Sequence, residues 1–270
     1  MTRSTFVGDI PHNYEKFLGP MIFAEYAKDL AKRIRAPKEG IILEIASGTG
    51  LASRQIRNII SQKTKIIVTD LSEDMLDISR GKFRDSENIE FKVADALDLP
   101  FQNGAFDAIA CQFSLMFFPD KLTALQEIAR TLKPGGRFYF NIWDSLEFNH
   151  LIQTVNETII KCFPGNHPRF FDIPYGYYEI DQIKRLLFLS GFSDVDISIL
   201  PRLSTADKAR DVALGYILGT PVISEIESLN SKPIPKVLEA VEKSISQKFG
   251  NRSITAKMQA IVFSALYPGK

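Results

Sequence analysis

The chain has 270 residues, of which 45% are hydrophobic and 24% charged, and its net charge is +1. This balance is typical of a globular protein with a full core, and it lacks the basic surplus of a nucleic-acid-binding domain. The N-terminus does not resemble a signal peptide and no run of about 18 apolar residues occurs, so we expect a cytoplasmic protein without a membrane span.

The two cysteines, Cys111 and Cys162, are expected to be free thiols, because disulfides are rare in cytoplasmic proteins. No group of cysteines and histidines has the spacing of zinc ligands. The sequence therefore predicts no metal site.

Short runs rich in β-branched residues alternate with helical patterns from about residue 40 to residue 200. Such alternation is typical of βαβ units in a mostly parallel sheet. Strands are predicted at 41–46, 65–69, 89–93, 106–113 and 137–143. Helices are predicted between them at 51–60, after the N-cap residue Ser72, and from Asp120 to Leu132.

The regular alternation ends after Trp143. Residues 163–178 are rich in proline and aromatic residues and are predicted to form a loop or insertion. Further helices are predicted at 146–162, 179–190, 204–219 and 235–249. Two more strands are predicted at 194–200 and 258–266.

Together these elements predict one α/β domain over residues 1–270. We expect a Rossmann-like, doubly wound sheet of seven strands whose last strand is antiparallel. Residues 10–35 are expected to form an N-terminal helical cap, and residues 40–145 the cofactor-binding core. The insertions at 146–178 and 201–256 are expected to form a helical lid that sets specificity.

A turn rich in small residues, Glu44-Ile-Ala-Ser-Gly-Thr-Gly50, joins the first predicted strand to the first predicted helix. Glycine allows the tight dihedrals of such a turn and lets the backbone approach a ligand. The free N–H groups at the start of the next helix favour an anionic group. The turn therefore predicts a ligand site at the carboxyl end of the sheet.

Two acidic residues follow at the ends of the next two predicted strands. Asp70 lies about 20 residues after Gly50, where an acid can bind the hydroxyls of a ribose. Asp95 can accept a hydrogen bond from an exocyclic amine such as that of adenine. The three signals in this order predict a nucleoside-containing cofactor.

These stretches resemble the class I S-adenosylmethionine-dependent methyltransferases, and among them the small-molecule branch that includes ubiquinone and menaquinone biosynthesis C-methyltransferases. The similarity covers roughly residues 40–145. It rests on Leu43-Glu-Ile-Ala-Ser-Gly-Thr-Gly50, Val68-Thr-Asp-Leu-Ser-Glu-Asp-Met-Leu76, Ala94-Asp-Ala-Leu-Asp-Leu-Pro-Phe101, Phe106-Asp107 and Leu132-Lys-Pro-Gly-Gly136. The resemblance implies S-adenosyl-L-methionine as the cofactor, S-adenosyl-L-homocysteine as its product, and a small-molecule methyl acceptor.

The resemblance also implies which residues bind the cofactor. The turn from Ala46 to Gly50 is expected to hold the methionine part, Asp70 both ribose hydroxyls, and Asp95 the adenine amine. The full set of expected cofactor-binding residues is Tyr14, Glu44, Ala46, Ser47, Gly48, Gly50, Asp70, Leu71, Met75, Asp95, Ala96, Gln112 and Phe113. Many relatives have glycine where this chain has Ala46, and we expect weak effects from this smallest of changes.

The expected roles differ within this set. Leu71 and Met75 are expected to flank the adenine, with the Ala96 amide nearby. Gln112 and Phe113 are expected to line the face where the methyl group is transferred. Tyr14 is expected to reach the cofactor from the N-terminal cap.

No residue stands out as a catalytic base. His150 follows the fifth predicted strand and is a weak candidate, with a surface or structural role as the alternative. The aromatic residues of the insertion either wall a substrate pocket or pack the insertion onto the core. Phe170, Phe171, Tyr175, Tyr177 and Tyr178 are the residues in question. Alignment of the reactants, rather than base catalysis, is the mechanism that this pattern favours.

The sequence also bears on several alternative functions. A nicotinamide-dinucleotide site requires a third glycine where the chain has Ser53. Cys111-Gln112-Phe113-Ser114 lacks the Asn/Asp-Pro-Pro-Tyr/Phe pattern of enzymes that methylate nucleic-acid bases, so no nucleic-acid partner is expected. A cofactor-binding protein without activity and a protein methyltransferase stay open, as does a homodimer.

Overall fold

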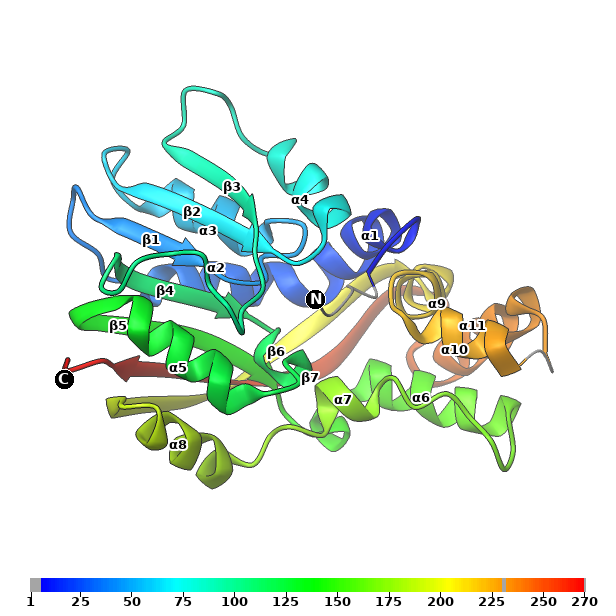
Figure 1. Ribbon diagram of the computed structural model, residues 1–270. Coiled ribbons are helices and arrows are strands. Elements are labelled where there is room, and N and C mark those ends of the chain that lie inside the picture. Colours follow the sequence, from blue (N-terminus) through cyan, green and yellow to red (C-terminus); the bar gives the residue numbers. More distant parts are fainter. Residues whose placement is uncertain (1–5, 230–231, 270) are drawn as a thin grey trace.

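The computed structural model describes residues 6–229 and 232–269. Seven strands form one sheet in the order β3-β2-β1-β4-β5-β7-β6 (Figure 1). Their bounds are β1 Ile41–Glu44, β2 Lys65–Asp70, β3 Ile89–Val93, β4 Phe106–Gln112, β5 Leu132–Trp143, β6 Ser193–Lys208 and β7 Arg252–Leu266. β1 to β5 pair in parallel, whereas β7 is antiparallel to both β5 and β6. The predicted seven-stranded sheet with an antiparallel last strand is confirmed.

Helices connect these strands and follow them. Their bounds are α1 Ile10–Asn13, η1 Tyr14–Phe23, α2 Ala24–Arg33, α3 Leu51–Ile59, α4 Glu73–Arg80, η2 Leu115–Phe117, α5 Lys121–Thr131, η3 Leu146–Phe148, α6 His150–Cys162, α7 Asp172–Tyr175, α8 Ile180–Leu189, α9 Ala209–Leu218, α10 Val222–Leu229 and α11 Ile234–Phe249.

The sheet is covered on both faces because its central strands bury successive side chains on opposite sides. In β1, Ile42 packs in a cluster with Leu30 of α2 and Ile56 of α3. Its neighbour Leu43 belongs to the other cluster, which includes Leu125 of α5. This doubly wound arrangement leaves the carboxyl ends of the parallel strands free to hold a site.

The N-terminal segment is helical from Ile10 to Arg33 and includes η1, a ten-residue π-helix. Pro20 lies inside η1, where it removes one backbone donor. η1 packs against α9 at Gly215, where an added Cβ atom would lie 3.0 Å from Phe17 Cβ. The N-terminal cap and the C-terminal helices therefore contact each other directly.

The last two strands are longer than the sequence predicts. The predicted helix from residue 204 is wrong up to Lys208, because β6 continues to that residue and pairs there with Arg252 of β7. β7 begins at Arg252 and not at residue 258. Cross-strand pairing such as Ser204 with Ala256 outweighs the local helical pattern. Residues 201–208 and 252–256 of the expected helical lid thus belong to the sheet.

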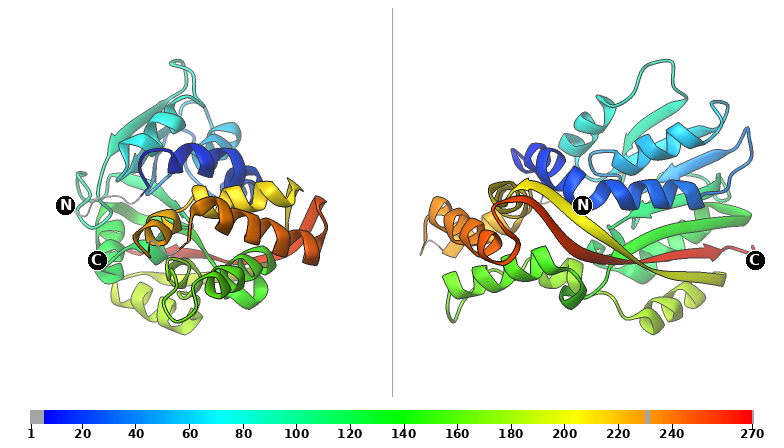
Figure 2. Two further views of the ribbon diagram at one scale, coloured as in Figure 1. Left: turned by 90° about the vertical axis from the view of Figure 1, so that its right-hand side faces the viewer. Right: turned by 180° about the vertical axis from the view of Figure 1, so that it is seen from behind.

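β6 and β7 extend beyond the other strands and reach a group of helices made of α6, α9, α10 and α11 (Figures 1 and 2). α10 and the short α7 were not predicted from the sequence, because they lie in segments rich in proline and turn residues. This group of helices lies beyond the carboxyl ends of β1 and β4 (Figure 1).

Two further features bear on the sequence predictions. Cys111 and Cys162 are both free, as predicted. Among the described residues, no single helix is both long and apolar enough for a membrane span, although α9 and α10 taken together, with a bend of 79°, are.

Candidate active site

A cavity of about 670 Å³ lies at the carboxyl ends of the parallel strands. The predicted site residues that line it are Tyr14, Ala46, Ser47, Gly48, Asp70, Leu71, Met75, Asp95, Ala96, Gln112 and Phe113. Glu44 and Gly50 are not in its lining, and neither is His150, the first residue of α6. The fold therefore brings eleven of the thirteen expected cofactor-binding residues to one cavity.

The turn between β1 and α3 has the tight geometry that its composition indicates. Gly48 and Gly50 have φ angles of +56° and +77°, which favour glycine. At Gly50 an added Cβ atom would lie only 2.0 Å from Ser79 Oγ, so that position has no room for a side chain. Ala46 also has a positive φ, +51°, a conformation that favours glycine over a residue with a Cβ atom.

Asp70 joins the turn to the end of β2. Its Oδ2 atom accepts a 2.7 Å hydrogen bond from Gly48 N, and its Oδ1 atom accepts one of 2.8 Å from Ser72 N. Burial raises the pKa of the Asp70 carboxyl, although these backbone hydrogen bonds lower it in part. The carboxylate is thus held rigidly at the cavity wall.

Glu44 lies beneath the turn and has no access to the cavity. Its side chain is fully buried and accepts a short hydrogen bond from the hydroxyl of Ser53. Burial raises the pKa of Glu44 to about 8. The residue therefore supports the turn from below, and its burial favours the protonated form of the carboxyl.

Residues after β2 and β3 line a neighbouring part of the cavity. Leu71 and Met75 come from the β2–α4 segment, and Asp95 and Ala96 follow β3. Asp95 Oδ1 accepts a 2.9 Å hydrogen bond from Leu97 N, which fixes the carboxylate. This part combines two apolar side chains with one oriented carboxylate.

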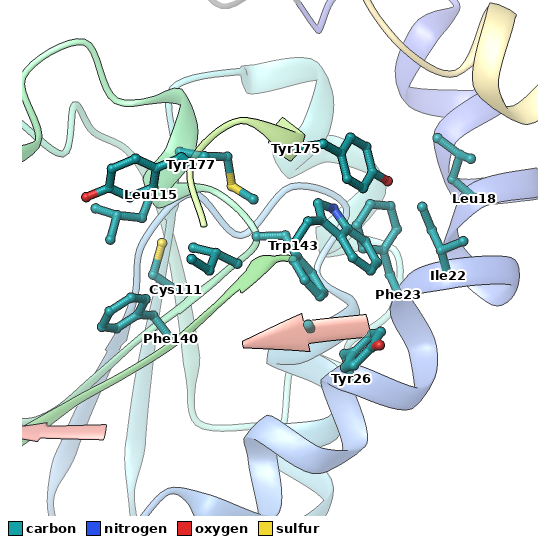
Figure 3. Packing of buried hydrophobic residues seen from close by; sticks show 14 of the residues in the cluster. Leu18, Ile22, Phe23, Tyr26, Cys111, Leu115, Phe140, Trp143, Tyr175 and Tyr177 are labelled. Atoms are coloured by element: carbon teal, nitrogen blue, oxygen red, sulfur yellow. The ribbon is translucent and has the colours of Figure 1, made fainter. Parts of the chain in front are cut away.

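Stacked aromatic rings form the wall beyond β4 and β5 (Figure 3). The Phe113 ring stacks on the Trp143 indole at a centroid distance of 3.9 Å, and Trp143 stacks on Tyr175 at 5.7 Å. Phe113 has a positive φ of +52°, a strained conformation that is common at functional sites. From the other side, Phe23 of η1 stacks on Tyr14 at 4.8 Å.

The insertion and the C-terminal helices supply the rest of the lining. Phe170, Phe171 and Tyr175 line the cavity, whereas Tyr177 and Tyr178 do not. Sequence reasoning missed Tyr216 of α9 and Glu225 of α10, which both line it. No local motif marks these two residues. Their place in the lining depends on the positions of α9 and α10, which follow from the pairing of the long strands β6 and β7.

The lining is poor in charge. Its only ionisable carboxyl groups are those of Asp70, Asp95 and Glu225, and it contains no lysine, arginine or histidine from the part of the chain that the structure describes. Glu225 is already engaged, because its Oε2 atom accepts hydrogen bonds of 2.6 Å from Arg169 N and 3.1 Å from Phe170 N. The cavity therefore offers no cation to an anionic ligand.

Three polar atoms at the turn end of the cavity are buried without a partner. They are Ser47 Oγ, Thr49 Oγ1 and Gln112 Oε1, all of residues that line the cavity. A buried polar atom without a hydrogen bond costs about 1–3 kcal/mol, so such atoms mark a surface built for a polar ligand. They fit a ligand with an amino acid portion beside the turn.

Comparison with known proteins places this site in a family. Residues 10–164 match the model of the ubiE/COQ5 methyltransferase family. The chain is 30% identical over 205 residues to the demethylmenaquinone methyltransferase of Staphylococcus epidermidis, a match that covers 71% of this chain and 85% of that protein. It is 41% identical over 98 residues to the demethylmenaquinone methyltransferase of Lactococcus lactis, which covers 36% of this chain and only 39% of that protein.

A solved structure has the same fold. Phosphoethanolamine N-methyltransferase 2 of Haemonchus contortus, in complex with S-adenosyl-L-methionine, superposes with a TM-score of 0.61 and 18% identity, over 99% of this chain and 59% of that one. At this identity the likeness concerns the fold alone. The family match, which covers more than half of the chain, goes further: the chain belongs to the ubiE/COQ5 methyltransferase family and is an S-adenosylmethionine-dependent methyltransferase.

Proposed function

We propose that the protein transfers a methyl group from S-adenosylmethionine to a ring carbon of a small, neutral, planar acceptor of the hydroquinone class. The observation that carries this proposal is the composition of the cavity, which runs from the Ala46–Gly50 turn to a wall of stacked aromatic rings and has no basic residue in its described lining. The names of the relatives in Staphylococcus epidermidis and Lactococcus lactis, both demethylmenaquinone methyltransferases, support the acceptor class.

We assign the turn end of the cavity to the cofactor. The backbone of Ala46–Gly50, with the unpaired Ser47 Oγ and Thr49 Oγ1 atoms, suits the methionine portion. We assign the ribose hydroxyls to Asp70 and the adenine amine to Asp95, as the family resemblance implies; both residues line the cavity. When bound, S-adenosylmethionine supplies an electrophilic methyl group on a sulfonium ion.

The remaining lining suits the acceptor. Phe113, Trp143 and Tyr175 present stacked ring faces, on which a planar molecule gains area and favourable ring geometry. An anionic acceptor would lose its hydration on entering the cavity and would find no cation there, so its binding would cost free energy. A neutral aromatic acceptor is therefore favoured over a phosphorylated or carboxylated one.

The side chains present act by alignment and by exclusion of water. Holding two reactants in an attack geometry lowers the barrier without any proton transfer by the protein. The ring oxygens of a hydroquinone make its carbons electron-rich, so a ring carbon can form the bond to the methyl group as the sulfur–methyl bond breaks and S-adenosylhomocysteine is formed. The proton of that ring carbon then passes to water, since the described lining contains no histidine. His150 is not needed in this proposal.

The enclosed shape of the acceptor end distinguishes this function from methylation of a protein. Phe170, Phe171 and Tyr175 are each less than 10% exposed, although they lie in the insertion. Such a buried aromatic pocket suits a small molecule, whereas a side chain on a folded protein needs an open groove.

Turnover tests the proposal and separates it from a cofactor-binding protein without activity. The acceptor is a reduced 2-alkyl-1,4-naphthoquinone with a free neighbouring ring position, and the matched control is the 2,3-dimethyl compound, in which that position is blocked. We expect a product in which a methyl group replaces one ring hydrogen, with an equal amount of S-adenosylhomocysteine, from the first compound only. If the protein binds S-adenosylhomocysteine but methylates no neutral planar acceptor, the proposal is wrong and the non-catalytic alternative is favoured.

A further inference from the structure

Two tyrosines from outside the predicted cofactor-binding core meet at the acceptor end of the cavity. Tyr175 belongs to α7 in the aromatic insertion, and Tyr216 belongs to α9 in the C-terminal group of helices. Both line the cavity, and they are only 6% and 3% exposed. Their hydroxyl groups lie near each other.

This pair has at least one hydroxyl hydrogen that the two groups do not use between them. Two neighbouring hydroxyls can share at most one of their two hydrogens, whichever group donates. In residues 6–229 and 232–269, neither hydroxyl has a side-chain hydrogen bond to any residue outside the pair. A buried donor without an acceptor is unfavourable, so the pair is suited to an oxygen that enters the cavity.

Three other polar side chains at this end are less suited to bind a ligand, because they already have partners or are exposed. The Thr220 hydroxyl donates a 2.7 Å hydrogen bond to the Tyr216 carbonyl oxygen, and Glu225 accepts from two backbone N–H groups. Ser224 lies on an exposed part of α10. The tyrosine pair, beside the indole N–H of Trp143, is therefore a buried polar group that is available for recognition at the acceptor end.

The pair also lies at the correct place for a planar molecule. Tyr175 stacks on Trp143 with an interplanar angle of 26°, and Trp143 stacks on Phe113, which is next to Gln112 in the chain. In Figure 3 the Tyr175 ring lies beside the Trp143 indole, and its hydroxyl points towards η1 with Leu18 and Ile22. A ring packed along this stack brings its substituents close to the tyrosine hydroxyls.

We propose that Tyr175 and Tyr216 together donate a hydrogen bond to a ring oxygen of the acceptor and so determine its specificity and orientation. This inference rests on the proposed function, since it assumes a neutral planar acceptor with an oxygen substituent. If so, residues of α7 and α9 make the protein bind aromatic rings that carry an oxygen substituent more tightly than rings that carry none.

The test uses two probes of equal shape, 2,3-dimethyl-1,4-naphthoquinone and 2,3-dimethylnaphthalene. Neither has a ring position that reacts with the free thiols. Their affinities for the protein with S-adenosylhomocysteine are measured by equilibrium dialysis, and quenching of Trp143, the single tryptophan, reports whether the quinone lies beside the stack. The variants are Tyr175→Phe, Tyr216→Phe and the double variant, with Tyr177→Phe as the control because Tyr177 does not line the cavity.

We expect the double variant to bind the quinone about three- to tenfold more weakly and the hydrocarbon equally well, since one hydrogen bond is lost and ring packing is kept. The single variants should lose less, because the remaining hydroxyl can still donate. Tyr177→Phe should match the wild type. Affinity for S-adenosylhomocysteine, measured by calorimetry, should be unchanged in every variant.

Two results would overturn the inference, and they differ from each other. If the double variant loses affinity for both probes alike, the tyrosines have a packing role only, and the proposed function stands. If the wild type binds neither probe, the proposed acceptor class fails and this inference fails with it.

Discussion

Two residues of the site, Ala46 and Phe113, have backbone angles that residues with a Cβ atom rarely adopt. Their φ angles are +51° and +52°. Phe113 gains a ring stack on Trp143 from this conformation, whereas the side chain of Ala46 is a single methyl group. A substitution at Ala46 can therefore relieve backbone strain without the loss of a ring contact.

Ala46→Gly should stabilise the protein. The left-handed conformation costs a residue with a Cβ atom about 1–2 kcal/mol, and the extra freedom of glycine in the unfolded chain offsets part of that gain. We expect a net increase of about 0.5–1 kcal/mol in the free energy of unfolding, measured by chemical denaturation. A decrease would show that the Ala46 methyl group makes contacts that outweigh the strain.

The buried carboxyl of Glu44 predicts a pH dependence of stability. Its pKa rises from 4.5 to about 8 on folding, so the folded state holds a proton that the unfolded state has lost between these values. Stability from this group is fully present below pH 4.5 and is lost as the pH rises towards 8.

Glu44→Gln should remove this dependence, because glutamine keeps the shape and does not ionise. Denaturation at pH 5 should find the variant and the wild type similar in stability. At pH 8 the wild type should be less stable than the variant, by on the order of 3 kcal/mol. Parallel pH profiles of the two proteins would show that Glu44 does not change its proton occupancy on folding.

At the scale of elements, Glu225 links α10 to the aromatic insertion. Its carboxylate accepts from the backbone N–H groups of Arg169 and Phe170, residues that come from the segment between α6 and α7. This contact joins two of the segments that enclose the acceptor end of the cavity.

Glu225→Ala should loosen that segment without unfolding the protein. Loss of the charged acceptor should speed amide hydrogen exchange at residues 169–171 by about five- to thirtyfold, because protection there depends on local opening. Glu227→Ala, an exposed position on the same helix, is the control and should exchange like the wild type. Equal exchange in all three proteins would mean that other contacts hold the insertion in place.

The elements also show where sequence reasoning succeeds and where it fails. Strands β1 to β4 and the turn after β1 are marked by local patterns, so Asp70 and Asp95 could be placed at strand ends before the structure was known. The position of Tyr216 could not be predicted, because it depends on pairing between β6 and β7, some fifty residues apart in the chain. Local composition at 204–208 favours a helix, and the partner strand decides otherwise.

At the scale of the whole molecule, the cavity joins two parts of the chain. The family match ends at residue 164, and the cofactor end of the cavity is built from residues before that point. Phe170, Tyr175, Tyr216 and Glu225 lie after it and line the end that we propose for the acceptor, together with Phe113 and Trp143. We therefore expect the cofactor to be common to the family, whereas the residues after 164 contribute most to the choice of acceptor.

The most direct test of this account is a calorimetric titration with S-adenosylhomocysteine of the wild type, Asp70→Ala and Asp77→Ala. Asp77 is exposed on α4 and does not line the cavity, so it is the matched control. We expect micromolar or tighter binding to the wild type and to Asp77→Ala, and at least tenfold weaker binding to a folded Asp70→Ala protein. Absence of binding to the wild type, or equal binding to all three, would contradict the assignment of this cavity to the cofactor.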